Sequence, residues 1–293
     1  MLSRVARRVA RPALQPSLGS AAAPAAPLSS LSSTASLDAS FDLRGRNAIV
    51  TGASSGLGNH FARVLASRGC RVAVLARREE RLSELVALMN NDNGECVRDS
   101  FARRLDVTDT GQVGEVLRNV GEELGGQIDI VVNNAGVGDG TMALDTTEDE
   151  YDRIMDTNQK GCFFVAQAAA AEMVRAGNAG SIINVASVAA FKTLPGLCVY
   201  SASKAGLVHM TRGLATEWAR HGIRVNAICP GYISTEMNAP LWETEAGKRI
   251  IKQVPQRRLG TEQDLDGALM LLASDAGAFM TGACINVDGG LSL

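Results

Sequence analysis

The chain has 293 residues, of which 46% are hydrophobic and 20% charged, with 30 Gly and only 8 Pro. This supply of apolar residues is sufficient for a large buried core and excludes disorder for the bulk of the chain. Since 29 Lys and Arg are balanced by 31 Asp and Glu, there is no basic excess to neutralise the phosphates of a nucleic acid. No apolar run reaches the length of a membrane span.

The first 40 residues differ in composition from the rest. They hold the arginines Arg4, Arg7, Arg8 and Arg11 and the single acid Asp38, and a Pro-, Ala- and Ser-rich stretch follows the arginines. This amphipathic, acid-poor pattern is typical of a transit peptide, and the arginines interrupt the apolar run that a secretory signal needs. We expect residues 1–40 to be a leader for the mitochondrial matrix, with a plastid leader, or a disordered tail on a cytoplasmic protein, as alternatives. Residues 41–293 then form one domain.

From residue 46 onward, short β-branched runs alternate with helical patterns, the longest of which cover 148–175 and 199–220. Seven runs are predicted strands: Asn47–Thr51, Arg71–Ala76, 102–107, 128–133, 181–186, 224–229 and Cys284–Val287. Their near-continuous apolar character is typical of strands buried on both faces, and the helices supply the crossovers of a parallel sheet. The sequence therefore predicts an α/β fold, a doubly wound Rossmann sheet of seven mostly parallel strands with helices on both faces.

The first predicted strand runs into a glycine-rich turn that opens a helix. Small residues let the backbone approach a pyrophosphate, and the helix N-terminus offers unpaired N–H groups and a partial positive charge. Glycines also end strands for steric reasons alone, but the place of this turn in the first βα unit favours a dinucleotide site. The candidate binding residues are Gly52, Ser54, Ser55, Gly56, Leu57 and Gly58.

The second predicted strand ends in Ala76-Arg77-Arg78. An acid at this place accepts a hydrogen bond from the ribose 2′-hydroxyl of NAD, whereas an arginine suits a 2′-phosphate. We therefore predict NADP(H) as the cofactor. Arg77 lies at the strand edge itself, and for Arg78 a solvated first helical turn is the simpler alternative.

Several motifs follow in a specific order: Asn133-Asn-Ala-Gly136, Asn158, Ser187, Tyr200-Ser-Ala-Ser-Lys204, and Pro230-Gly231 with Thr235. Tyr200 lies thirteen positions after Ser187. Together with the glycine-rich turn, these motifs resemble the short-chain dehydrogenase/reductase family, in the branch of the 3-oxoacyl carrier-protein reductases, over about residues 41–290. The resemblance implies hydride transfer from a nicotinamide cofactor.

The residues themselves support acid–base chemistry. Tyr200 and Lys204 are four apart in a helical pattern and share one face. A phenol is a weak acid and a weak base at neutral pH, and an adjacent ammonium favours its ionised form. Ser187 follows a predicted strand at its carboxyl end, where its hydroxyl can hold a substrate oxygen. By resemblance, Lys204 also binds the nicotinamide ribose, and Asn158 supports a water chain that relays protons.

The resemblance also implies the rest of the cofactor site. Asp106, next to Val107, fits the adenine amino group, although it is equally a candidate helix N-cap. The segment of Asn133, Ala135 and Gly136 lies under the adenine ribose. The nicotinamide end is assigned to Pro230, Gly231, Ile233 and Thr235, and a substrate-covering lid to 234–255, which an ordinary pair of surface helices would resemble.

The cysteines lie in apolar stretches without a CxxC pair and predict reduced thiols in a reducing compartment: Cys70, Cys96, Cys162, Cys198, Cys229 and Cys284. None of His60, His209 and His221 is spaced from a cysteine like a ligand set, so we expect no metal site. Small residues on the two longest helical patterns, expected on outer faces, favour close packing between subunits and a homotetramer.

We therefore expect an NADP(H)-dependent oxidoreductase that interconverts a ketone and a secondary alcohol. A 3-oxoacyl-[acyl-carrier-protein] reductase of organellar fatty-acid synthesis is the alternative within the family. Arg175, Arg220 and Arg224 would have to form a basic patch for an acidic carrier to dock on this acidic domain. A sugar-nucleotide epimerase would need a different glycine spacing. A nucleotide-binding scaffold without turnover has no need of a phenol and an ammonium on one helical face.

Overall fold

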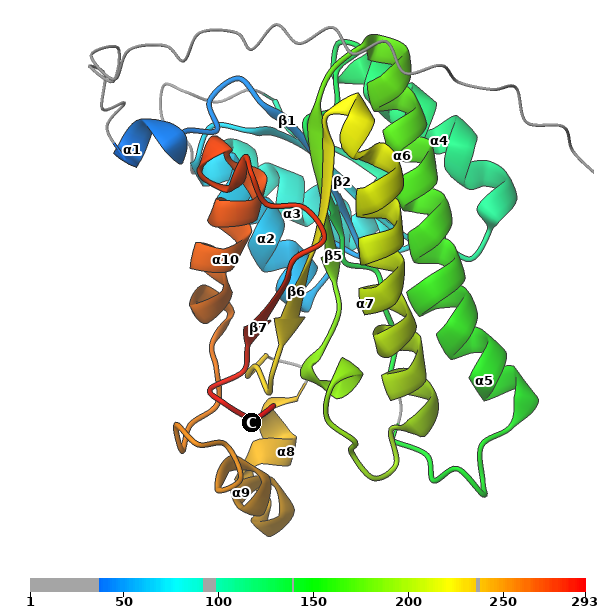
Figure 1. Cartoon of the computed structure of the whole chain (residues 1–293), viewed down its shortest axis with the longest axis vertical. Coiled ribbons are helices and arrows are strands. Elements are labelled where there is room, and N and C mark those ends of the chain that lie inside the picture. The colour runs from blue at the N-terminus through cyan, green and yellow to red at the C-terminus, as the bar shows by residue number, and fades with distance from the viewer. Residues whose placement is uncertain (1–36, 92–98, 139, 236–237) are drawn as a thin grey trace, which may run out of the picture. The chain divides into compact units, whose positions relative to one another are not determined.

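The computed structural model describes residues 37–91, 99–138, 140–235 and 238–293 (Figure 1). Residues 1–36, which are nearly all of the predicted leader, lie outside the described residues. Cys96 and, in the predicted lid, Met237 also lie outside them. The described part of the predicted leader is a short helix, α1 (Leu37–Ser40). The role of the predicted leader in targeting therefore stays a prediction. Among the described residues, no helix is both long enough and apolar enough to cross a bilayer.

Seven parallel strands form one sheet in the order β3-β2-β1-β4-β5-β6-β7. This confirms the predicted doubly wound sheet. The chain order reverses between β1 and β4, and a ligand crevice forms at such a switch point, outside the carboxyl ends of the strands. The strands are β1 (Asn47–Thr51), β2 (Arg71–Ala76), β3 (Phe101–Arg104), β4 (Ile130–Asn133), β5 (Gly180–Val185), β6 (Ile223–Pro230) and β7 (Cys284–Val287).

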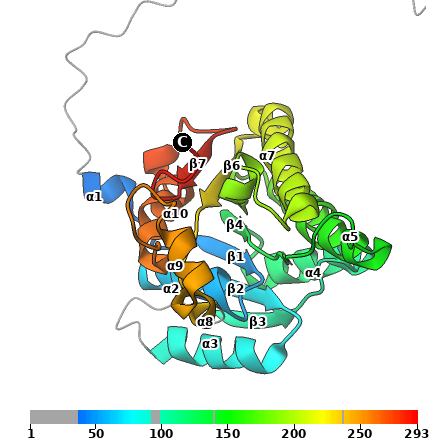
Figure 2. The ribbon, with the colours of Figure 1, turned by 90° about the horizontal axis from the view of Figure 1, so that it is seen from below.

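Helices cover both faces of the sheet, as Figure 2 shows. Alternate residues of β1 explain why both layers form: Val50 packs toward one layer and Ile49 toward the other, and both are fully buried. One layer consists of α2 (Gly56–Ser67), α3 (Glu79–Asn91) and α10 (Asp266–Ala273). The other consists of α4 (Thr110–Glu123), α6 (Cys162–Ala176) and α7 (Cys198–Trp218). Two short helices, α8 (Ala239–Glu243) and α9 (Glu245–Ile251), follow β6.

The helix predicted over 148–175 is not continuous. It consists of α5 (Glu148–Met155), a π-helical turn (Asp156–Gly161) and α6. A Cβ on Gly161 would lie 2.7 Å from the carbonyl oxygen of Val107, so glycine permits the close approach of this turn to the loop after β3. The widened turn carries Asn158, in line with the occurrence of π-turns at functional sites.

The small residues of α6 and α7 do not all lie on outer faces, as had been expected. Ala166, Ala169, Ala170 and Ala215 are buried within the subunit, because their small side chains let these helices pack closely on the sheet. The exposed small residues of the predicted stripe are Ala171 on α6 and Ala202, Ala205 and Gly213 on α7. Only this part of the predicted stripe is available to a second subunit.

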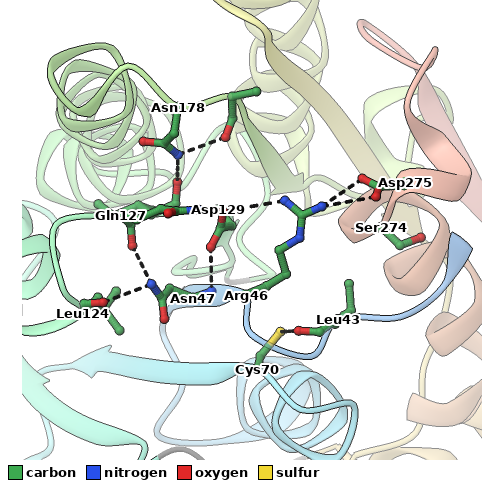
Figure 3. Close-up of polar contacts among 12 residues, drawn as sticks. Leu43, Arg46, Asn47, Cys70, Leu124, Gln127, Asp129, Asn178, Ser274 and Asp275 are labelled. Atoms are coloured by element: carbon green, nitrogen blue, oxygen red, sulfur yellow. Dashed lines mark hydrogen bonds and ion pairs between the residues drawn. The ribbon is translucent and has the colours of Figure 1, made fainter. Parts of the chain in front are cut away.

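A hydrogen-bonded cluster fixes the amino ends of β1 and β4 (Figure 3). The buried carboxylate of Asp129 accepts from the Asn47 backbone N–H at 2.8 Å and from Gln127 Nε2 at 2.6 Å. Arg46 lies 3.7 Å from Asp129 and donates to Asp275 at 3.1 Å. Because removing a partner of Asp129 would leave its buried carboxylate under-satisfied, the contacts of Asp129 are costly to lose, whereas the exposed Arg46–Asp275 pair contributes little. The cluster holds the base of the sheet rigid, opposite the crevice.

Candidate active site

A cleft of about 960 Å³ opens along the carboxyl ends of the strands, the position expected for a ligand site in this kind of sheet. It brings together most of the predicted site residues, which come from seven separate segments. Those that line it are Gly52, Ser54, Ser55, Gly56, Leu57, Arg77, Arg78, Asp106, Val107, Ala135, Gly136, Ser187, Tyr200, Lys204, Pro230, Gly231, Ile233 and Thr235.

Three predicted site residues, Gly58, Asn133 and Asn158, are not among those that line the cleft. Gly58 lies against the carbonyl of Gly52, which a Cβ would approach to 2.5 Å. The side chain of Asn133 is buried and donates to the carbonyl of Cys162 at 2.7 Å. Its neighbour Asn134 lines the cleft instead, and all three predicted residues shape the wall from behind.

The glycine-rich turn fits the diphosphate of a dinucleotide. Gly52 has φ +65°, and a Cβ there would meet the backbone of Ala135 at 2.8 Å, so the loop needs glycine at this position. The space around Gly56 is open. Ser55, the N-cap of α2, makes no side-chain capping bond, which leaves the first N–H groups of the helix for an anion.

Arg78 extends over this turn. Its guanidinium donates to Ser54 Oγ and, through Nη2, to Ser55 Oγ at 2.8 Å. Arg77 is exposed and lies 3.9 Å from the carboxylate of Asp106. Two hydroxyls of the turn thus hold the Arg78 side chain, but Arg78 is also exposed at the start of α3, so the alternative of a solvated first helical turn is not overturned. The sequence could not reveal these contacts, since both arginines follow the same strand.

Asp106 forms a tight turn before α4. Its carboxylate accepts from the backbone N–H and the hydroxyl of Thr108, at 3.0 and 2.8 Å. Partial burial raises its pKa, but these hydrogen bonds and the charge of Arg77 outweigh burial, so the pKa of Asp106 lies below its usual value. The N-cap residue of α4 is Asp109, which excludes the helix-cap alternative for Asp106.

The phenol and the ammonium meet at one side of the cleft. Lys204, only 4% exposed, donates to the carbonyl of Val185 at 2.9 Å. Its Nζ lies 5.8 Å from the centre of the Tyr200 ring. Ser187 follows β5, and its Oγ accepts from the backbone N–H of Ala189 at 3.1 Å. The Ser187 hydroxyl hydrogen stays available for an oxygen in the cleft.

Asn158 clamps the loop that follows β4. Its Oδ1 accepts from Val137 N at 2.8 Å, and its Nδ2 donates to Val137 O at 2.7 Å and to Ser203 Oγ at 3.0 Å. Ser203 in turn donates to the carbonyl of Tyr200 at 2.7 Å. The side chain thus connects the π-turn to the helix that carries Tyr200 and Lys204.

Several lining residues were not singled out from the sequence as binding residues: Asn134, Arg153, Asp156, Thr157 and Asn238. Tyr232 and Trp242 were expected with the substrate-covering lid, and both line the cleft. Arg153, Asp156 and Thr157 belong to α5 and the π-turn, whose widened geometry has no sequence signature. Asn238 and Trp242 lie in the predicted lid segment, and their spacing of four residues at the start of a helix was the available signal.

Comparisons with known proteins match this description. A family model described as enoyl-(acyl carrier protein) reductase matches residues 52–292. A 3-oxoacyl-[acyl-carrier-protein] reductase of Staphylococcus aureus is 36% identical over 246 residues, which cover 84% of this chain and 98% of that protein. A short-chain type dehydrogenase/reductase structure from Mycobacterium marinum is 40% identical with a TM-score of 0.81, covering 87% of this chain and 99% of that one.

A gluconate 5-dehydrogenase of Burkholderia cenocepacia, solved in complex with NADP and tartrate, is 35% identical. It has a TM-score of 0.81, and the match covers 86% of this chain and 97% of that one. The fold and the cleft define a doubly wound protein with a dinucleotide-type crevice. The chain belongs to the short-chain dehydrogenase/reductase family, as its motifs predicted.

Proposed function

We propose that the protein is an NADP(H)-dependent oxidoreductase that interconverts a ketone and a secondary alcohol. One observation carries the proposal: Ser187, Tyr200 and Lys204 line the same cleft as the glycine-rich turn. Membership of an oxidoreductase family supports the reaction class. A scaffold without turnover would need no such set of groups.

Arg78, Ser54 and Ser55 support NADP(H) over NAD(H). They place a cation and two hydroxyls beside the end of β2, where a 2′-phosphate would receive charge-assisted hydrogen bonds. The related gluconate 5-dehydrogenase was solved with NADP. When bound, the cofactor supplies or accepts the hydride.

The side chains of this chain supply the remaining chemistry. Ser187 donates a hydrogen bond to the carbonyl oxygen and orients it. In reduction, the Tyr200 hydroxyl donates its proton to that oxygen as the carbonyl carbon is reduced, so the carbonyl becomes a hydroxyl and Tyr200 a phenolate. The ammonium of Lys204 stabilises the phenolate. Asn158, through its hydrogen bond to Ser203, holds the helix that carries Tyr200 and Lys204.

The turnover test is direct. NADPH oxidation is followed with a panel of ketones, using protein without residues 1–40. Ketone-dependent oxidation that Tyr200→Phe abolishes is expected. If the protein binds NADPH but no ketone in the panel supports its oxidation, a nucleotide-binding scaffold is the better description.

A small or coenzyme-linked ketone is a better candidate substrate than a carrier-bound acyl group. A carrier would need a basic patch of Arg175, Arg220 and Arg224, and two of the three are engaged elsewhere. Arg224 is half-buried and donates to the carbonyls of Leu272 and Ser274, and Arg175 is paired with Glu172. The carrier-protein alternative keeps the support of the Staphylococcus aureus relative.

Kinetics separate the two substrates. The value of kcat/KM is measured for an acetoacetyl group on carrier protein and on coenzyme A at two salt concentrations. We expect no carrier preference. A preference above about tenfold that weakens with salt would restore the carrier-protein reductase, because electrostatic docking is screened by ions.

A further inference from the structure

Two aromatic side chains form one wall of the cleft. The rings of Tyr232 and Trp242 pack edge to face, with centres 5.4 Å apart and planes at 65°. Both residues line the cleft, and Trp242 is only 9% exposed. Desolvation by burial raises the pKa of Tyr232, as expected for a phenol in apolar surroundings.

The wall rests on the segment that carries the candidate catalytic serine. Tyr232 packs against a buried cluster of Val188, Val254 and Leu291. Val188 directly follows Ser187, and Ser187, Tyr232 and Trp242 line the same cleft. Lys192 donates to the carbonyl of Leu291 at 2.7 Å, and this hydrogen bond holds Leu291 in the cluster.

Asn238 holds the wall in place with three hydrogen bonds. Its Oδ1 accepts from Trp242 Nε1 and from the backbone N–H of Thr235, both at 2.8 Å. Its Nδ2 donates to the carbonyl of Ile233 at 2.8 Å. One amide thus satisfies the indole and two backbone groups of the loop after β6. No other side chain of this size offers an oxygen with two lone pairs and an N–H donor together.

We propose that Asn238 is a positioning residue that fixes Trp242 and Tyr232 as a preformed wall, and that this wall selects ketones presenting an apolar group to it. The inference rests on the proposed function for the position of the reacting carbonyl. The proposal means that the segment 238–243 is already in place before a ligand binds. It replaces the expectation of a lid that becomes ordered only on binding.

The chemistry of the wall determines the substrate class. An apolar substituent against the two rings gains by leaving water, and aromatic faces add to this gain. A hydroxyl or carboxylate packed against the carbon atoms of the same two rings would lose its water without gaining a hydrogen-bond partner from them, which is unfavourable. The substrate class is therefore a ketone with an alkyl or aryl group, and a polyhydroxylated keto acid is disfavoured.

Fluorescence tests the preformed wall without any turnover. The chain has two tryptophans, so Trp218→Phe at the end of α7 leaves Trp242 as the only emitter. We expect the ligand-free protein to show blue-shifted emission of high anisotropy. NADPH and substrate should neither shift the emission further to the blue nor raise its anisotropy. Asn238→Ala should shift the emission to the red and lower its anisotropy. Gln253→Ala, an exposed position after α9, is the matched control and should change neither.

Selectivity tests the assigned substrate class. The ratio of kcat/KM for an alkyl or aryl ketone to that for a polyhydroxylated ketone of similar size should fall about tenfold in Asn238→Ala and in Trp242→Ala, a size typical of lost apolar pocket contacts. Asn238→Asp retains the acceptor for Trp242 and should restore the emission in part. If Asn238→Ala fails to fold, Asn238→Asp and Trp242→Phe are compared by the same ratio.

Three results would overturn the proposal: water-like Trp242 emission in the ligand-free protein, unchanged emission and ratio in Asn238→Ala, or an unmutated protein that prefers the polyhydroxylated ketone. Failure of the proposed function is distinguishable, because it would appear as an absence of turnover with every ketone while the fluorescence of Trp242 still reports on the wall.

Discussion

Arg78 donates two hydrogen bonds to the hydroxyl of Ser54, at 3.1 Å from Nε and 2.9 Å from Nη2. This contact holds the guanidinium over the glycine-rich turn, whereas Arg77 has two thirds of its side chain exposed, at 67%. Of the two arginines, Arg78 is therefore the better placed to receive a 2′-phosphate.

The first prediction concerns nucleotide choice. We expect NADPH to bind more tightly than NADH by about tenfold to a hundredfold, because a charge-assisted hydrogen bond contributes about 1.5 to 3 kcal/mol. Arg78→Ala should remove most of this preference, and Arg77→Ala less of it. Titration of both nucleotides by calorimetry gives the Kd values. Equal values for the unmutated protein would contradict the assignment.

The second prediction separates chemistry from binding. Tyr200→Phe should abolish turnover and leave the Kd of NADPH nearly unchanged, because the lost hydroxyl acts on the reacting oxygen. Lys204→Ala should damage both, since its Nζ lies 5.8 Å from the centre of the Tyr200 ring and the family resemblance implies that it also binds the nicotinamide ribose. Steady-state kinetics and nucleotide titration are the measurements. Retention of more than about a tenth of kcat in Tyr200→Phe would exclude the acid–base role.

The third prediction concerns the thiols. Burial raises the pKa of Cys162 and of Cys229 to about 12, so in mildly alkaline buffer both thiols are almost wholly protonated and therefore weakly nucleophilic. Cys198 is exposed at the start of α7. Alkylation of the native protein in mildly alkaline buffer, followed by mass spectrometry, should label Cys198 and spare Cys162 and Cys229. Labelling of the buried pair before Cys198 would show that the core opens readily.

The fourth prediction concerns assembly. The exposed small residues of α7 permit another helix to approach closely, and we expect a homotetramer. Ala205→Glu should weaken it, because a charged side chain would be buried at the contact. Sedimentation at micromolar concentration is the measurement. A species with the mass of one chain, 30.7 kDa, in the unmutated protein would contradict the expectation.

The fifth prediction concerns the amino terminus. Deletion of residues 1–40 should leave folding and activity unchanged and should abolish import into mitochondria. A deletion extended through Leu43 is the contrasting variant. Leu43 is fully buried, so its loss should cost about 1.5 to 3 kcal/mol of stability. Import unaffected by the shorter deletion would leave the segment without a targeting role.

The strands were predictable because each is a short apolar run, and burial on both faces requires such a run. The ends of the strands were less predictable. β3 ends at Arg104, three residues before the predicted end at residue 107, because its pairing with β2 stops there. The π-turn at Asp156–Gly161 was missed, since its hydrogen-bond register depends on the contact of Gly161 with Val107. A helical pattern does not encode that contact.

Motifs located the catalytic candidates because their spacing is itself the pattern. Motifs could not decide between Arg77 and Arg78, or between Asn133 and Asn134. Both arginines line the cleft but make different contacts, whereas Asn133 is buried behind it and Asn134 lines it, and only the packed backbone determines these differences. Asn238 was missed because its role comes from three simultaneous hydrogen bonds, which no local composition reveals.

The cluster at the base of the sheet has a consequence for the order of folding. The partners of Asn47 lie 77 to 82 residues further along the chain, and Asp275, the partner of Arg46, lies 229 residues away. A chain emerging from the ribosome presents β1 long before these groups exist. Contacts so distant in sequence form late, after the cost of closing large loops has been met. The segment that carries the glycine-rich turn therefore completes its native contacts only once residues beyond α10 have been synthesised.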